Sequence, residues 1–238
     1  MKKHLFIITS AINTKFGSYD PDQRLLQTFD TFNTIRERVP DAKIIIVESS
    51  GYKLEQEKLD ILSSKTNGVI NMSGDPAIQR YYNGTDNWDI VKNMCEIMCF
   101  GSALQVIEDN TNFLKECDVV HKLSGRYVLT DDFNLENYEK YPDKIIYHEK
   151  MQSQFDPTFV GIPYQYPSML YSWAISQHNV IKDFYKKATT ELSNRLSQGK
   201  YADIEHLMWS IIPEDCVQEV PMIGVMGRLG QNRVQVFR

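Results

Sequence analysis

Cysteines are few in this sequence of 238 residues, and their spacing does not suit a metal centre. Cys95, Cys99, Cys117 and Cys216 form no Cys-x-x-Cys pair and have no paired histidines beside them, so a zinc site is not expected. Cys95 and Cys99 stand one helical turn apart among apolar neighbours, which is typical of small core residues. The cysteine pattern therefore predicts a reducing, cytoplasmic environment and no disulfide framework.

The chain also lacks a long hydrophobic run and an excess of positive charge. The apolar stretch Leu5 to Ile8 follows two lysines but stops at Thr9, which is too short for a signal peptide or a membrane span. We therefore expect a first strand there and no transmembrane segment. The formal net charge of −5 disfavours nucleic acid and anionic membranes as general partners.

No glycine-rich phosphate loop follows this first predicted strand. The segment Thr9 to Asn13, TSAIN, fits neither the Walker pattern nor the dinucleotide fingerprint, so a P-loop ATPase or an NAD enzyme is disfavoured.

The hydrophobic content of 42% and the charged content of 24% are ordinary for a folded globular protein. We expect residues 1–238 to form a single domain.

Apolar runs and helical periods alternate through the first half of the chain. Continuous apolar runs predict buried strands at 5–9, 43–47, 68–72 and 119–123, and 3.6-residue spacing predicts helices at 22–38, from about 54 to 62, and at 88–109. Strands that alternate with helices predict an α/β fold, in which a mostly parallel, Rossmann-type sheet is flanked by helices on both faces.

The second half of the chain is less regular and predicts an irregular α+β arrangement. We expect a strand at 144–148, a loop rich in proline and tyrosine at 155–167, a largely helical stretch at 169–198 and a short helix at 203–212. Strand-like runs follow in the tail, around Gly224, Gly227 and Gly230.

The turn after the fourth predicted strand is the most informative segment. The run from Cys117 to Leu129 reads as a buried strand that ends in a polar turn, and this turn carries the two cations Lys122 and Arg126. Ligands in α/β folds bind at strand ends, so the turn is a candidate anion site. The alternative is that these cations form salt bridges with Asp118, Asp131 or Asp132.

The segment Lys122 to Tyr127, KLSGRY, resembles the Lys-x-Ser-Gly-Arg-Tyr segment of small bacterial and phage-encoded nucleotide-sugar glycosyltransferases of the GT-A type. The order of elements over residues 4–135 and the helix around Lys92 to Glu96 resemble the same family. The resemblance implies a GT-A-like fold in which residues 1–135 bind the nucleotide sugar and residues 136–238 bind the acceptor. It implies a glycosyltransferase that moves a sugar from a nucleoside-diphosphate sugar, a UDP-sugar first of all, to a glycan or other hydroxyl acceptor.

Typical GT-A enzymes keep a metal-binding Asp-x-Asp motif where this chain has Lys122-Leu123-Ser124. We expect Lys122 and Arg126 to stabilise the leaving diphosphate, because lysine and arginine supply the charge that a metal otherwise supplies. Asp131 and Asp132 are the candidate ligands for Mn²⁺ or Mg²⁺, although they equally fit a solvated helix cap. Both metal-dependent and metal-independent transfer stay open.

The resemblance also implies where the donor binds. Hydroxyl, carboxylate and cationic groups are expected around it at strand ends, on one helix, in the turn and in the tail: Thr9, Ser10, Ala11, Ile12, Glu48, Lys92, Ser124, Gly125 and Arg228. The alternatives are ordinary turn residues at the strand ends, and for Lys92 an ion pair with Glu96 within its own helix.

A base that activates the acceptor is expected in the second half of the chain. Asp203 and Glu205 open the short helix there and are the candidates, although Asp203 equally fits a helix cap.

Two other functions compete with a glycosyltransferase. A nucleotidyltransferase shares the α/β half but usually needs a glycine-rich loop, and a non-catalytic module that binds nucleotide sugars fits the missing Asp-x-Asp.

Overall fold

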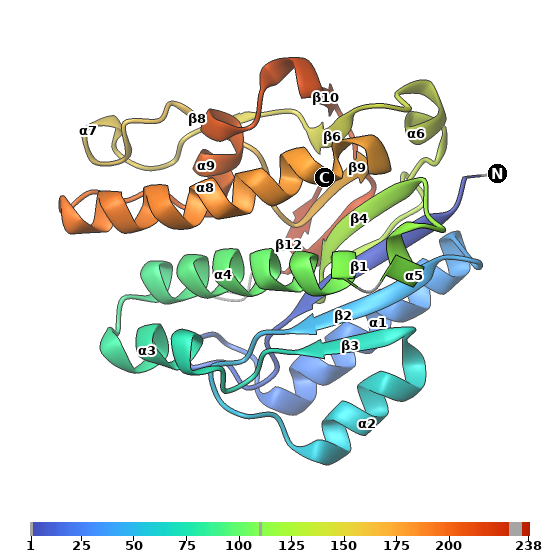
Figure 1. Ribbon diagram of the computed structural model, residues 1–238, viewed down its shortest axis with the longest axis horizontal. Coiled ribbons are helices and arrows are strands. Elements are labelled where there is room, and N and C mark those ends of the chain that lie inside the picture. Colours follow the sequence, from blue (N-terminus) through green and yellow to red (C-terminus); the bar gives the residue numbers. More distant parts are fainter. Residues whose placement is uncertain (1, 110, 229–234) are drawn as a thin grey trace.

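The computed structural model describes residues 2–109, 111–228 and 235–238. At its centre lies a seven-stranded sheet in the order β10-β6-β9-β4-β1-β2-β3 (Figure 1). Four of these strands come from the first half of the chain and run parallel to one another: β1 (His4–Ser10), β2 (Lys43–Glu48), β3 (Gly68–Asn71) and β4 (Val119–Ser124). Their positions confirm the strands predicted from continuous apolar runs.

The other three strands of the sheet come from the second half of the chain. β6 (Ile145–His148) and β10 (Val217–Val220) pair in parallel, and β9 (Leu170–Ala174) runs antiparallel between β4 and β6. The helix expected from residue 169 is therefore wrong at its start, because α8 spans only His178–Ser197. The polar Ser172 interrupts the apolar run of β9, so no continuous run predicts a strand there, and pairing with β4 and β6 decides its conformation.

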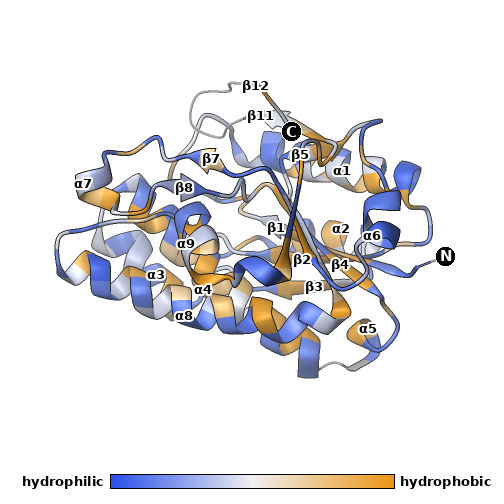
Figure 2. Ribbon diagram, turned by 90° about the horizontal axis from the view of Figure 1, so that it is seen from above, coloured by the Kyte–Doolittle hydropathy of each residue, from blue (hydrophilic) through white to orange (hydrophobic). Residues whose placement is uncertain are grey.

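Helices cover both faces of the sheet, as the alternating side chains of β1 demonstrate. Leu5 and Ile7 pack in one core cluster with α4 (Trp88–Asp109), α8 and α9 (Ile204–Ile211). Phe6 and Ile8 pack in a second cluster on the opposite face, with α1 (Pro21–Arg38) and α2 (Gln56–Lys65). Hydrophobic residues accordingly concentrate on the central strands (Figure 2). The α/β fold class predicted from the sequence is confirmed.

Helix α4 is long and apolar. Among the described residues it is the only helix whose length and composition would allow it to cross a membrane. More than half of that apolar window is buried inside the fold, where α4 packs against the sheet and α8. These contacts are typical of a core helix.

Helix α1 buries a polar face toward the turn between β4 and β5 (Tyr127–Leu129). Asp20 caps its first turn, with Pro21 as the first helical residue, as both residue types favour. Thr28 donates to the carbonyl of Gly125 at 3.2 Å, and Thr31 donates to that of Tyr127 at 2.8 Å. The turn after β4 is thereby held against the middle of α1.

The remaining elements are short. β5 forms a second, antiparallel sheet with β11 (Val225–Arg228) and β12 (Gln235–Phe237), and β7 (Met151–Gln152) pairs with β8 (Tyr164–Gln165). The described residues also form the short α-helices α3 (Pro76–Gly84), α5 (Thr111–Leu114), α6 (Glu136–Lys140) and α7 (Pro157–Val160), and the 3₁₀ helices η1 (Ile175–Gln177) and η2 (Glu214–Cys216). α3 lies between the strand expected at 68–72 and the helix expected at 88–109, where the sequence predicted no element.

Candidate functional site

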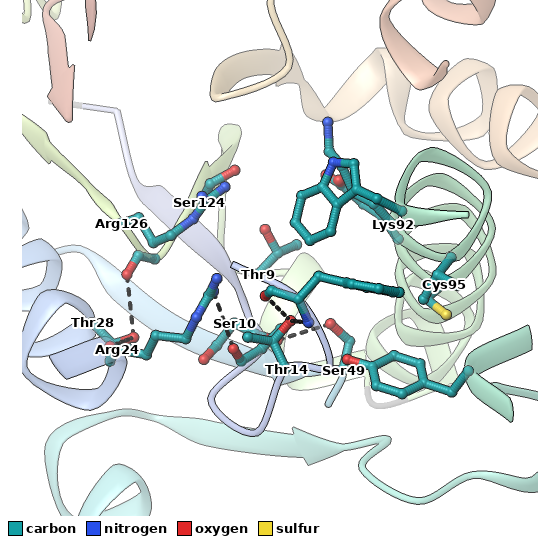
Figure 3. A pocket seen from close by; sticks show the side chains of 17 residues that line it. Thr9, Ser10, Thr14, Arg24, Thr28, Ser49, Lys92, Cys95, Ser124 and Arg126 are labelled. Atoms are coloured by element: carbon teal, nitrogen blue, oxygen red, sulfur yellow. Dashed lines mark hydrogen bonds between the residues drawn. The ribbon is translucent and has the colours of Figure 1, made fainter. Parts of the chain in front are cut away.

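A cavity opens at the carboxyl ends of β1, β2 and β4, between α1 and α4 (Figure 3). Its volume is about 120 Å³. Seven of the residues predicted from the sequence line it: Thr9, Ser10, Ala11, Lys92, Ser124, Gly125 and Arg126. The structure thus brings the end of β1, the turn after β4 and helix α4 to the edge of the sheet where ligands of α/β folds bind.

Aromatic side chains form one part of the cavity wall. Phe16, Tyr82 and Trp88, here called the aromatic part, come from the loop after β1, from α3 and from the start of α4. The rings of Phe16 and Trp88 meet edge to face, with centroids 5.6 Å apart. Ser49 and Thr14 add hydroxyl groups beside them. Flat apolar surface with a few hydroxyl groups suits a nucleobase and its ribose.

Three cationic side chains also line the cavity, and we call Arg24, Lys92 and Arg126 its cationic part. Arg24 and Arg126 approach from the side of α1 and the β4–β5 turn, and Lys92 approaches from α4 (Figure 3). Among the described residues, Arg126 has no salt bridge, and its guanidinium lies 5.8 Å from the ring centroid of Tyr127. Three cations thus line a cavity whose lining, among the described residues, holds one carboxylate, Glu96. This excess of positive charge suits an anion.

Arg24 is the most constrained member of the cationic part. Only 6% of the residue is exposed, and its Nη1 donates to the carbonyl of Ala11 at 3.2 Å. Its Nε is buried and has no hydrogen-bond partner within the described part of the chain. Burial, followed by the like charge of Arg126, lowers the pKa of Arg24 to about 10. A bound anion would satisfy the unpartnered donor and reduce this repulsion.

Lys92 faces the cavity from α4 and pairs with a carboxylate behind it. Its Nζ lies 3.9 Å from Oε1 of Glu205 on α9. The charge of Glu205 raises the pKa of Lys92 above its ordinary value, so Lys92 is a cation at neutral pH. The ion pair within one helix that the sequence allowed, between Lys92 and Glu96, is not among the salt bridges of the described residues.

Lys122 does not line the cavity, and its partner is not one of the aspartates considered from the sequence. The side chain is fully buried, and its Nζ donates to Oε1 of Glu96 at 2.7 Å, to Oγ of Ser124 at 3.1 Å and to the carbonyl of Ser168 at 2.8 Å. An ammonium group has three protons, so all of them are engaged. Direct contact between Lys122 and a diphosphate does not fit this geometry.

Glu96 lies between the buried Lys122 and the cavity. It is the only carboxylate among the described residues that line the cavity, and 18% of its side chain is exposed. Burial raises its pKa, but the charges of Lys122, Lys92 and Arg126 outweigh burial, so the pKa lies below its ordinary value. Glu96 is therefore ionised at neutral pH.

Glu48 and Ile12 lie behind the cavity wall instead of lining it. Glu48 is fully buried, and its Oε1 accepts from the backbone N–H of Ile12 at 3.2 Å and of Ser50 at 2.9 Å, as well as from the Ser50 hydroxyl. Burial raises the pKa of this carboxyl. Glu48 thus fixes the loops after β1 and β2, which is a different position from the direct nucleoside contact expected of it.

The two candidate bases at the start of α9 have different environments. Asp203 caps the helix. It accepts from the backbone N–H of His206 at 3.4 Å and is hydrogen-bonded to Nδ1 of the same residue. Its position agrees with the helix cap that the sequence offered as the alternative to a base. Glu205 accepts from the Ser168 hydroxyl, and burial raises its pKa. Its Oε2 is buried without a partner among the described residues. Glu205 reaches the cavity edge through Lys92 but does not line it.

The candidate metal ligands lie away from the cavity. Asp131 pairs with Arg38 at the C-terminal end of α1, while the cavity meets α1 at Arg24 and Thr28. Thr28 lies ten residues before Arg38, which at 1.5 Å per residue is roughly 15 Å along the helix. No group of three or more histidine, cysteine, aspartate or glutamate side chains suited to a metal occurs in the described chain. Asp131 and Asp132 are therefore too distant for a metal that contacts a diphosphate in the cavity.

Arg228, expected to close over the diphosphate, ends β11, and its side chain lies outside the described part of the chain. The lining residues that sequence reasoning missed are mainly Arg24 and the aromatic part. Glu96 was considered only as a partner of Lys92 on the helix beside the donor, not as a site residue. Arg24 carried a usable signal, because it shares one helical face with Thr28 and Thr31. That polar face lies directly after a loop that leaves the carboxyl end of a strand.

No protein-family model matches the sequence, and no curated protein matches it. Among solved structures, 4-diphosphocytidyl-2C-methyl-D-erythritol synthase from Anaerococcus prevotii is 13% identical, with a TM-score of 0.43, over 98% of this chain and 92% of that chain. Mouse xyloside xylosyltransferase 1 is 9% identical, with a TM-score of 0.47, over 92% of this chain and 85% of that chain. At such low similarity, the ligand of this chain has to be inferred from its own residues.

Proposed function

We propose that this protein is a glycosyltransferase that takes a sugar from a nucleoside-diphosphate sugar, a UDP-sugar first of all, and moves it to a glycan or other hydroxyl acceptor. The observation that carries the proposal is the convergence of Arg24, Lys92 and Arg126 on one cavity at the carboxyl ends of β1 and β4. A diphosphate is the common anion whose charge and size suit two guanidinium groups and an ammonium group.

The chemistry of transfer explains why the cations are placed there. When the bond between the sugar and the diphosphate breaks, negative charge grows on the departing phosphate oxygens and has to be stabilised. Arg24 and Arg126 can each donate two parallel hydrogen bonds to phosphate, and Lys92 adds a third charge. In this proposal Lys122 acts indirectly, through Glu96, because its own donors are engaged.

The aromatic part suits the nucleoside end of the same donor. Tyr82 and Trp88 offer ring faces or edges to a base, and the hydroxyl groups of Ser49 and Thr14 lie within the same wall. A nucleoside diphosphate would then span the cavity, with its base at the aromatic part and its phosphates at the cationic part. The sugar would extend from the β4 end toward α9, where Glu205 is the candidate acceptor base.

Calorimetric titration with UDP, UMP, CTP, UDP-glucose and UDP-galactose, with and without Mn²⁺, tests the proposal. We expect UDP to bind more tightly than UMP, because the second phosphate adds contacts with the cationic part. Arg126→Gln should weaken UDP binding by roughly 10- to 100-fold, as the loss of hydrogen bonds to a charged group predicts. Arg38→Gln, at the far end of α1, is the matched control and should bind UDP as the wild type does.

The competing functions give different results in the same experiment. Equal affinity for UDP and UMP would contradict a diphosphate site. Preference for CTP over every nucleotide sugar would favour a nucleotidyltransferase. Release of UDP from a bound UDP-sugar, measured over hours without acceptor, separates an enzyme from a non-catalytic binding module.

A further inference from the structure

Glu96 is an unexpected group to find in a cavity built for an anion. It lines the cavity on α4, one helical turn after Lys92, and it faces the same space as Arg24 and Arg126. A carboxylate beside a diphosphate site repels the ligand that the cations attract. If Glu96 has a function in the site, we expect it to act on the bound donor and not in donor binding.

The geometry of Glu96 is fixed on one side and open on the other. Its Oε1 accepts from Lys122 at 2.7 Å, and Lys122 is anchored in turn by Ser124 and by the carbonyl of Ser168. Among the described residues, no hydrogen bond engages Oε2. A fully buried lysine is costly unless it is well paired, and here the pairing orients one oxygen while the other stays available at the cavity wall.

The charge state of Glu96 contrasts with that of Glu205, the other carboxyl group beside Lys92. Three cations hold the pKa of Glu96 below its ordinary value, whereas burial raises the pKa of Glu205. Two carboxyl groups whose environments push their pKa values apart take different parts in a reaction. Of the two, Glu96 has the lower pKa and therefore keeps its negative charge to lower pH.

We propose that the Glu96 carboxylate stabilises the positive charge that develops on the anomeric carbon of the bound donor, and that Lys122 is its positioning residue. The inference rests on the proposed function. As the bond between the anomeric carbon and the diphosphate oxygen breaks, its electron pair leaves with the diphosphate, which the cationic part neutralises. The acceptor oxygen then bonds to the anomeric carbon, and the acceptor proton passes to Glu205, the candidate base.

This role separates binding from turnover, because Glu96 interacts favourably with the transition state and unfavourably with the ground state. The Glu96→Gln variant should therefore bind UDP as tightly as the wild type or more tightly. Its kcat should fall by roughly 10²- to 10³-fold, the range seen when one preorganised electrostatic group is removed from an active site. A purely structural role for Glu96 predicts the opposite pattern, with altered stability and unchanged kcat.

The experiment measures UDP release from UDP-glucose, UDP-galactose, UDP-xylose and UDP-N-acetylglucosamine, with water as the acceptor, alongside calorimetric affinity for UDP. Glu108→Gln is the matched control, because Glu108 lies on the same helix but pairs with Lys182 at the opposite end from the cavity. If Glu96→Gln does not fold, because it leaves the buried Lys122 charge uncompensated, the double variant Glu96→Gln/Lys122→Met removes both charges and takes its place.

The outcomes distinguish this inference from the proposed function. Loss of kcat with retained UDP affinity supports the role of Glu96. Turnover of Glu96→Gln within threefold of the wild type overturns that role and leaves the glycosyltransferase standing. Wild-type protein that releases no UDP from any of the four donors overturns both.

The positioning role of Lys122 has its own readout. Without the Lys122 charge the pKa of Glu96 should rise, so the acidic limb of the kcat profile should move to higher pH in Lys122→Met. A profile that keeps its wild-type position would overturn the positioning role.

Discussion

His4 and His121 lie side by side on the adjacent strands β1 and β4, with their rings stacked at a centroid distance of 5.2 Å and a hydrogen bond of 2.9 Å between Nδ1 of His4 and Nε2 of His121. His121 is fully buried and bonds through its other nitrogen to the Ser172 hydroxyl at 2.7 Å. A shared hydrogen bond between two imidazoles requires at least one of them to be neutral. The centre of the sheet is therefore built for uncharged histidines.

This pair should make the fold sensitive to acid. Burial lowers the pKa of both histidines, that of His121 the further, and the neighbouring charges of Asp118 and Glu139 only partly oppose this for His4. The unfolded chain takes up protons below about pH 6.5, whereas the folded pair does so only at lower pH. The free energy of unfolding should thus fall as the pH drops below 6.5, by at most about 1.4 kcal/mol per pH unit for each histidine, until its folded pKa is reached.

Urea unfolding between pH 5 and pH 8 measures this dependence. His121→Gln removes one titrating group while keeping a hydrogen-bonding side chain opposite Ser172, so its stability should depend less steeply on pH than that of the wild type. Identical slopes for the two proteins would contradict a neutral pair.

Replacing Arg24 should lower the affinity for UDP with little loss of stability. Its replacement by glutamine removes a buried charge that lies near Arg126, and burial of an uncompensated charge is costly. We expect unliganded Arg24→Gln to melt no lower than about 2 °C below the wild type, while its affinity for UDP falls by roughly 10- to 100-fold. Thermal melts with and without saturating UDP check both parts. A variant that is strongly destabilised yet binds UDP normally would assign Arg24 a structural role.

Gly51 should control the position of Tyr82. A Cβ added to Gly51 would lie 2.1 Å from the Tyr82 ring, so the ring has to move, at a cost of about 1–3 kcal/mol for overpacking. Because Tyr82 belongs to the aromatic part and not to the cationic part, Gly51→Ala should weaken UDP binding but leave pyrophosphate binding unchanged. Calorimetry with the two ligands makes the comparison.

Gly84→Ala is the control for this substitution, since it lies at the end of the same helix as Tyr82 and a Cβ there meets no atom within 4 Å. Equal losses of UDP and pyrophosphate affinity in Gly51→Ala would mean that the whole site had been disturbed.

Asp131 and Asp132 should be dispensable for ligand binding. Asp131 is 90% exposed and pairs with Arg38 on the surface, where ion pairs contribute less than about 1 kcal/mol. The double variant Asp131→Asn/Asp132→Asn should keep the wild-type affinity for UDP, and any effect of Mn²⁺ on that affinity should be the same in both proteins. A Mn²⁺ effect that disappears in the variant would restore these residues as metal ligands.

The sequence was most informative where one local signal decides the structure. Four apolar runs predicted the parallel strands, and the helical period from Trp88 to Asp109 predicted α4 to the residue. β9 was missed because the polar Ser172 interrupts its apolar run and α8 begins four residues after it ends, and its conformation comes from pairing with β4 and β6. A local pattern predicts a short strand well only when its apolar run is unbroken.

The site was predicted in part for a related reason. Strand ends and the turn at Ser124 to Arg126 follow from the order of elements, because carboxyl ends of parallel strands share one edge of the sheet. The partner of Lys122 did not follow, since Glu96 lies 26 residues away and nothing in their spacing joins them. Arg24 was overlooked because the apolar residues of α1 suggested a different inward face. The helix also turns a polar face inward, because Thr28 and Thr31 donate to carbonyls of the β4–β5 turn. Arg24 lies on that polar face.

The hydroxyl groups of Thr28 and Thr31 bond to main-chain carbonyls on both sides of Arg126, at Gly125 and Tyr127. They recognise the path of the backbone and are indifferent to the side chain at position 126. A different residue at that position would be presented to the cavity from the same place. The charge preference of this site is therefore open to redesign by a single substitution, without rebuilding the turn that carries it.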